Sequence, residues 1–341
     1  MKKIKVCIIG LGRFGMLLEN DKKRLKPATH FGLWSNSKNV TLVGVSDNDL
    51  SKEKIVKKKN SKIKFYTNYK KMLHECKPDI ISIVTWKDTH FSITKYASNF
   101  GVKVIILEKP LANNKSQGKK LINIIKRNKT HLIVNHRRRF DDDVVRLKNN
   151  IDKNNYGKAL QATVSYVYGI LATGTHVIDT LRMLFSKKYG DIVNVIGIKD
   201  KNQSFCSPDD LNLNGILFFE KGLVCYIQVL NIKKYDIFDF DLLFEKNKIK
   251  ITGIGRDIYK YRIKKSQEHT YFTELDDDSR IRLAGPEPRN QFKLLEKNAI
   301  KCLQGKEKPN SSGMDSYKAL VIIDTLIKSS KSNSQKIKIK Y

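Results

Sequence analysis

The residues whose types and spacing best suit chemistry form a glycine-rich turn directly after an apolar strand. The predicted strand is Ile4–Ile9, and the turn reads Gly10-Leu11-Gly12-Arg13-Phe14-Gly15. In such a turn the first glycine permits the tight bend and the second lets the backbone approach a pyrophosphate. The third lets a helix pack closely, with its N-terminal N–H groups and positive dipole end aimed at the phosphates. The turn, with Arg13 and Phe14, therefore predicts a dinucleotide site.

A carboxylate at the end of the next apolar run indicates which dinucleotide is bound. Asp47 follows the predicted strand Val40–Val45, where it would accept hydrogen bonds from the adenosine ribose. The same carboxylate repels a 2′-phosphate, so the sequence favours NAD over NADP. The alternative is a plain glycine-rich turn with Asp47 as a solvated loop residue.

Three polar segments follow later strands and mark one edge of the predicted sheet. Strands and helices alternate through the first third of the chain, which predicts a doubly wound, NAD-binding domain over residues 1–135. The ligand of such a sheet lies outside the carboxyl ends of its strands. The segments there are Thr85–His90, Glu108-Lys109-Pro110 and Asn135–Phe140. Each alone is compatible with a solvated loop, but together they predict that Thr85, His90, Glu108 and Lys109 contact the cofactor.

The second half of the chain changes to long strands with period-two alternation. They are predicted at 159–168, 194–199, 215–220, 223–230, 236–244 and 248–252, with helices at 290–303 and 314–330. The fold class is therefore α/β, with an N-terminal doubly wound Rossmann domain and a C-terminal α+β domain. The second domain, residues 136–341, is predicted to hold a large, mostly antiparallel, open-faced sheet and to serve substrate binding and oligomerisation. The final helix could pack back on the first domain.

Composition narrows the range of functions. The formal charge of +32 comes from 66 Lys and Arg against 34 Asp and Glu, but the basic residues are spread out and lack interleaved aromatics that stack on bases. A compositional bias explains this charge better than specific nucleic-acid binding. The five cysteines are scattered, which predicts small buried side chains and neither disulfides nor a metal site. No apolar run is long enough to cross a bilayer and no secretory segment is seen, so we expect a cytoplasmic protein with no membrane partner.

Several of these segments together resemble the glucose-fructose oxidoreductase / inositol dehydrogenase (Gfo/Idh/MocA) family. The resemblance spans nearly the whole chain, down to Ser312-Gly313-Met314-Asp315. The motifs that carry it are Gly10–Gly15, Asp47, Thr85–His90, Glu108-Lys109-Pro110 and Gly174–Arg182. It implies NAD(P)-dependent oxidation or reduction of a sugar, cyclitol or nucleotide-sugar hydroxyl, with the nicotinamide between the two domains.

The resemblance also implies roles for single residues. Lys109, in its Glu-Lys-Pro setting, matches the catalytic lysine, which serves as proton donor or acceptor and stabilises an alkoxide. The bond before Pro110 is implied to be cis. His176 begins a helix from which Asp179 projects on the same face, so we expect His176 to shuttle the hydroxyl proton and Asp179 to orient it or bind substrate. The alternatives are an exposed loop lysine and a helix-capping histidine.

One position departs from the family pattern. Ala172 stands where many relatives place an aspartate, four residues before the histidine. The lysine-plus-histidine version, used by some relatives on nucleotide-linked or modified sugars, fits better than one for free inositol. Arg138 and Tyr168 are further expected substrate contacts, and ion pairs with Asp141 to Asp143 are an equal alternative for Arg138 and Arg139.

Two function classes stay open, and one insert needs an explanation. The leading hypothesis is an NAD-dependent sugar dehydrogenase, and the alternative is a non-catalytic dinucleotide-binding sensor or scaffold on the same fold. The insert Asp21–His30 lies between the expected first helix and the second strand. It resembles a segment of a family subset, or it is a solvated loop. The uncovered face of the second sheet predicts a homodimer or homotetramer.

Overall fold

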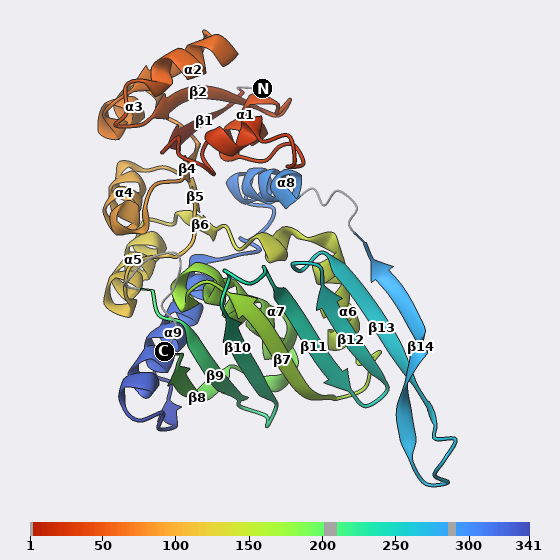
Figure 1. The fold of residues 1–341 in the computed structure, drawn as a ribbon. Helices are drawn as coiled ribbons and strands as arrows, with labels where there is room; N and C mark the ends of the chain where they lie inside the picture. Colours follow the sequence, from red (N-terminus) through yellow and green to blue (C-terminus); the bar gives the residue numbers. More distant parts are fainter. Residues whose placement is uncertain (1–2, 201–209, 286–290) are drawn as a thin grey trace. The chain divides into compact units, whose positions relative to one another are not determined.

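The computed structural model describes residues 3–200, 210–285 and 291–341, and the chain divides into two units (Figure 1). The first unit comprises Met1–Phe140 and Asn290–Tyr317, and the second comprises Asp141–Arg289 and Lys318–Tyr341. This differs from the expected division at residues 135 and 136, because a late segment returns to the first unit. The returning segment carries α8 (Gln291–Leu303), whose Phe292 and Leu295 are buried in the first unit's core.

Sheet A of the first unit has six parallel strands in the order β3-β2-β1-β4-β5-β6. They are β1 (Ile4–Ile9), β2 (Val40–Ser46), β3 (Lys64–Tyr66), β4 (Ile80–Ile83), β5 (Val104–Leu107) and β6 (His131–Val134). The central strands are buried on both faces, which explains why they read as nearly continuous apolar runs. The strand order reverses between β1 and β4, where a doubly wound sheet opens a crevice for its ligand. The predicted Rossmann domain is confirmed.

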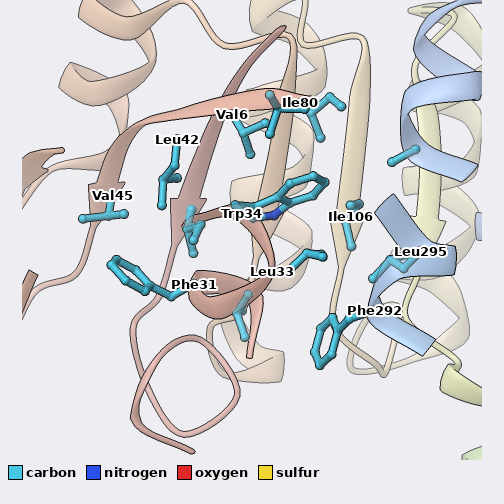
Figure 2. Close-up of a cluster of buried hydrophobic side chains, with 14 of the residues drawn as sticks. Val6, Phe31, Leu33, Trp34, Leu42, Val45, Ile80, Ile106, Phe292 and Leu295 are labelled. Carbon is cyan, nitrogen blue, oxygen red and sulfur yellow. The ribbon is translucent and has the colours of Figure 1, made fainter. Parts of the chain in front are cut away.

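Helices cover both faces of sheet A. Figure 2 shows one face, where Trp34 of α1 (His30–Ser35) and Leu295 of α8 pack with side chains of β1, β2, β4 and β5. Val56 of α2 (Lys52–Lys59) joins the same cluster. In Figure 1 the other side of the sheet carries α3 (Tyr69–Cys76), α4 (Lys87–Phe100) and α5 (Lys115–Arg127).

The helix expected directly after Gly15 is interrupted. Residues 12–16 make one helical turn, followed by a 3₁₀ turn η1 (Leu17–Asn20) and a loop. The α-helix α1 comes after the insert, and it continues the first turn in space: His30 N–H donates to Phe14 O at 3.1 Å, and Phe31 N–H to Gly15 O at 2.9 Å. Residues 17–29, named the excursion below, are therefore looped out of one helix. The sequence placed this helix before the insert, and that expectation is wrong.

Sheet B of the second unit has nine strands in the order β14-β13-β12-β11-β7-β10-β9-β8-β15. Only the β7 and β10 pair is parallel among these described strands, which confirms a mostly antiparallel sheet. The strands are β7 (Ala159–Val167), β8 (Ile192–Lys199), β9 (Leu213–Phe219), β10 (Val224–Leu230), β11 (Phe238–Phe244), β12 (Asn247–Thr252), β13 (Asp257–Lys265), β14 (Thr273–Ala284) and β15 (Ile337–Lys338).

Helices cover one face of sheet B. Phe185 of α7 (Thr175–Tyr189) makes ring contacts with Phe219 and Phe244 of the sheet. The others are α6 (Asp142–Asp152) and the C-terminal part of α9 (Gly313–Lys331), where Leu326 lies against Gly197. Four cysteines are buried and free, namely Cys7, Cys76, Cys225 and Cys302, while Cys206 lies outside the described residues. No helix in the described ranges is long and apolar enough to span a membrane.

Candidate functional site

The three glycines of the turn have the geometry that a dinucleotide requires. Gly10 has φ +92°, and a Cβ there would lie 2.7 Å from Val84 O, so only glycine fits where the turn meets the end of β4. A Cβ on Gly15 would lie 2.2 Å from Gly10 O, whereas one on Gly12 would meet nothing within 4 Å. Gly10 and Gly15 are thus required by close packing, and Gly12 borders open space. This is the cradle that a pyrophosphate needs, so these residues fit the cofactor.

Asp47 lies at the end of β2 beside the same turn. Its Oδ2 accepts a hydrogen bond from Leu11 N–H at 2.7 Å, and its Oδ1 accepts one from Asp49 N–H at 3.0 Å. The bond from Leu11 ties the expected ribose ligand to the glycine turn. Lys52 Nζ lies 2.9 Å from Asp47 Oδ2, with 17% of the lysine side chain exposed. The sequence analysis missed Lys52, although a lysine in the first turn of the helix after Asp47 was a usable signal.

Glu108 and Lys109 follow β5 at the same edge. Glu108 Oε1 accepts hydrogen bonds from His30 Nε2 at 3.0 Å and from Asn135 Nδ2 at 2.7 Å. Burial alone would raise the pKa of Glu108, but the His30 bond and charge, the Asn135 amide and the charge of Lys109 lower that pKa to about 2. Glu108 is therefore ionised at neutral pH. The Lys109–Pro110 bond is cis, as the resemblance implied.

His90 and Thr85 belong to the segment after β4. His90 is 1% exposed, and its Nδ1 lies 2.7 Å from Pro110 O while its Nε2 lies 3.0 Å from Thr85 O. Both ring nitrogens therefore face backbone carbonyl oxygens, so this histidine ties the segment after β4 to the turn after β5. Trp86, between them, is 86% exposed at the same edge. Gly10, Asp47, Thr85, Glu108 and the residues around them are brought together as expected.

The residues expected on the substrate side lie in the second unit. Tyr168, with φ +66°, leads into a π-helical turn η3 (Ile170–Gly174) directly before α7. His176 is half-buried in the first turn of α7, and Asp179 is 1% exposed one turn later. Lys109 belongs to the first unit and His176 to the second.

A carboxylate that the sequence analysis missed supports this turn. Asp210 accepts hydrogen bonds from Leu171 N–H at 2.8 Å and from Ala172 N–H at 2.9 Å. A Cβ on Gly169 would lie 2.0 Å from the Asp210 carboxyl carbon, so the glycine makes room for it. An acid from a distant loop thus binds the backbone at Ala172. Its separation from the turn in sequence left no local signal.

The arginine-rich segment after β6 forms a 3₁₀ turn η2 (Arg137–Phe140). Arg138 is half-buried in it, and Arg139 pairs with Asp315 at 3.3 Å. Asp141 accepts hydrogen bonds from the first turn of α6. Among the described residues, no group of three or more His, Cys, Asp or Glu side chains is placed to hold a metal ion.

The comparisons agree with this geometry. Residues 4–136 match the model of an oxidoreductase family with an NAD-binding Rossmann fold. A comparison with curated proteins finds no match to the sequence.

Solved structures resemble the whole chain. The WlbA dehydrogenase from Bordetella pertussis, in complex with NADH and UDP-GlcNAcA, has a TM-score of 0.76 at 16% identity, with 100% of both chains covered. An oxidoreductase from Agrobacterium radiobacter, in complex with NAD+, L-tartaric acid and magnesium, has a TM-score of 0.74 at 16% identity, covering 99% of this chain and 98% of the other. The aldose-aldose oxidoreductase from Caulobacter crescentus, complexed with glycerol, has a TM-score of 0.76 at 15% identity, covering 99% of this chain and 100% of the other. At these identities the likeness shows the fold.

Proposed function

We propose that the chain is an NAD-dependent sugar oxidoreductase. The premise is that residues 4–136 belong to the Gfo/Idh/MocA oxidoreductase family with its NAD-binding Rossmann fold. The reaction is hydride transfer between the nicotinamide and a secondary hydroxyl or ketone of a sugar. One observation carries the proposal: the glycine cradle, Asp47 and the Glu108-Lys109-Pro110 turn meet at one edge of sheet A. A fold alone would not identify an enzyme, but a lysine at this edge provides an acid and base beside the cofactor.

The substrate class is a modified, phosphorylated or nucleotide-linked sugar. The structural relative from Bordetella pertussis was crystallised with UDP-GlcNAcA, an anionic nucleotide sugar. The net charge of +32 favours the approach of such an anion. Arg138 and Tyr168 are proposed substrate contacts, because a guanidinium suits a phosphate or carboxylate and a phenol suits a sugar hydroxyl.

Lys109 and His176 are the proposed catalytic residues. The bound nicotinamide accepts or supplies the hydride. Lys109 takes the proton from the substrate hydroxyl in oxidation, or returns it to the carbonyl oxygen in reduction, and its charge stabilises the alkoxide between the two. His176 hydrogen-bonds the same oxygen and carries the proton onward, with Asp179 one helical turn away to orient it.

Asp47 sets the proposed preference for NAD. Its carboxylate hydrogen-bonds the ribose diol and repels a 2′-phosphate, so NAD(H) should bind about tenfold tighter than NADP(H) or better. Equal affinities in titration calorimetry would contradict this role of Asp47.

A homodimer or homotetramer is the proposed assembly. The strands of sheet B alternate between buried and half-buried residues, and Leu160 is 60% exposed on β7. An exposed apolar sheet face favours association with a second copy. A monomer at micromolar concentration in sedimentation would contradict this proposal.

A substrate screen with a matched variant tests the enzyme. Sugars, sugar phosphates and nucleotide sugars are offered with NAD or NADH, and absorbance at the nicotinamide band is followed. Lys109→Met should keep NADH affinity and lower kcat by roughly two to four orders of magnitude. Near-normal turnover in this variant would overturn the mechanism. Tight NADH binding by the wild type with no turnover of any sugar would instead support a dinucleotide sensor.

A further inference from the structure

The turn that carries Lys109 is bound on both sides by buried histidines that come from other elements. His30, from α1, binds the residue before Lys109, and His90, from α4, binds the residue after it. Both rings are almost fully buried, at 0% and 1% exposure. Neither ring is placed to act on a substrate, yet each has a polar contact with the turn.

His30 is fixed on every side. Its Nδ1 lies 3.1 Å from Ser82 Oγ, which also accepts a hydrogen bond from Trp34 Nε1–H at 2.8 Å. Its ring meets Phe292 of α8 edge-on, with 5.4 Å between ring centres. A hydroxyl can donate to or accept from Nδ1, so Nε2 can carry its proton toward Glu108 in either protonation state of the ring. The ionised Glu108 carboxylate can therefore accept from His30 in both protonation states of the ring.

His90 faces two acceptors. Pro110 O and Thr85 O are both carbonyl oxygens and neither can donate, so a neutral ring with one N–H can satisfy only one of them. Burial lowers the pKa of His90 below its ordinary value, and it outweighs the two backbone bonds and the charges of Glu108 and Asp88, which raise that pKa. The shorter contact, 2.7 Å to Pro110 O, favours Nδ1 as the nitrogen that carries the proton in the neutral ring. His90 then holds the residue after Lys109.

We propose that His30 and His90 are positioning residues that hold the Glu108–Pro110 segment from its two sides and thereby fix the amine of Lys109. The inference rests on the proposed catalytic function of Lys109. It moves His90 from the cofactor contacts to the residues that support the catalytic turn. The excursion contributes to this arrangement. The chain returns from it at Thr29, whose Oγ1 accepts a hydrogen bond from Gly32 N–H, so that α1 begins at His30.

The first test measures Lys109 without a substrate. Trace acylation by an amine-reactive anhydride at several pH values, read by peptide mass spectrometry, gives the apparent pKa and accessibility of Lys109. In His30→Leu, Glu108 loses its donor and the residue before Lys109 is less restrained, so Lys109 should acylate at least about twofold faster. In His90→Leu, the Pro110 carbonyl is released and Lys109 should acylate at least about twofold faster, since a less restrained turn is more open.

Matched variants separate positioning from general damage. His30→Gln and His90→Gln keep an amide donor toward the same oxygen and should restore most of the wild-type labelling. His74→Leu is the control, because His74 lies in the same unit but bonds Tyr96 of α4. Once a substrate is known, the two leucine variants should lower kcat about 10- to 100-fold, with smaller changes in KM.

The outcomes also distinguish this inference from the proposed function. Unchanged Lys109 labelling in both leucine variants, with NADH binding intact, would overturn the inference even if the enzyme is active. If those variants fail to fold, wild type with isotope-labelled histidine decides by NMR: a neutral His90 protonated on Nε2, or a His30 without a proton on Nε2, would overturn it. If the wild type is inactive but the leucine variants change the labelling of Lys109 as expected, the proposed function is overturned. The positioning of the turn by the two histidines stays supported.

Discussion

Replacing Glu108 with glutamine tests how strongly the first unit depends on one buried charge. Glutamine keeps the shape of the side chain, and its carbonyl oxygen can still accept from His30 and Asn135. Only the charge is lost. Because these partners and Lys109 hold the pKa of Glu108 low, the ionised side chain stabilises the folded state and the amide should not replace it fully.

The size of the effect follows from linkage between the pKa and folding. The pKa of Glu108 falls from 4.5 to about 2 on folding, which corresponds to about 3 kcal/mol of stability at pH 7. A depressed carboxyl pKa means that this stability is complete above pH 4.5 and is lost as the pH falls toward 2. By pH 3.5 roughly 1 kcal/mol of it should be gone. Glu108→Gln should therefore be about 3 kcal/mol less stable than wild type at pH 7 and about 2 kcal/mol less stable at pH 3.5.

The two tryptophans of the chain provide the assay. Both lie in the first unit, where Trp34 is 1% exposed and Trp86 is 86% exposed. In a Trp86→Phe background, urea unfolding followed by Trp34 fluorescence reports on the first unit alone. Glu53→Gln, in the first turn of α2, is the control and should change stability by less than about 1 kcal/mol. A Glu108→Gln deficit that is the same at both pH values would refute the reasoning.

Four other substitutions give direct readouts. Gly12→Val should leave the unfolding midpoint nearly unchanged, because a Cβ at Gly12 would meet no atom within 4 Å apart from its chain neighbours, yet it should abolish NADH binding in calorimetry. Gly15→Ala should instead destabilise the fold, and the opposite pattern would count against the cradle. Lys52→Met removes the cation beside Asp47 and should raise the ratio of the NADP Kd to the NAD Kd roughly two- to fivefold. A constant or falling ratio would exclude Lys52 from cofactor selection. Asp210→Ala deprives two backbone N–H groups of their acceptor, costs about 2–3 kcal/mol, and should speed hydrogen exchange in the peptide before α7; unchanged exchange there would be inconsistent with its supporting role.

The parts of the fold that were predictable are those with a local periodic signal. The strands β1, β4 and β5 are buried on both faces and read as apolar runs, so the Rossmann order followed from them. The hairpin of β13 and β14 was not predicted, because these strands alternate little and most of their residues are exposed or half-buried. A strand that buries neither face carries no binary pattern to detect.

The site divides in the same way. The glycines and Asp47 were predictable because a motif of fixed spacing brings them together. The contacts of His30 with Glu108, and of Asp210 with Ala172, join residues 78 and 38 positions apart. No local pattern in the sequence predicts either contact, because tertiary packing alone creates it. The position of α1 was not predictable for a related reason: the helix that the excursion interrupts is continuous in space and not along the chain.

The return of α8 to the first unit has a consequence for how the protein is made. Residues 141–289 emerge from the ribosome before α8 does, which at usual rates of synthesis takes roughly 7 to 30 seconds. During that interval the face of sheet A on which Leu33 and Trp34 of α1 pack lacks the cover that Phe292 and Leu295 later provide (Figure 2). The nascent Rossmann half is therefore an incomplete structure with an exposed apolar surface, which makes it a natural client for chaperones. A nonsense mutation before residue 290 would leave that surface permanently exposed.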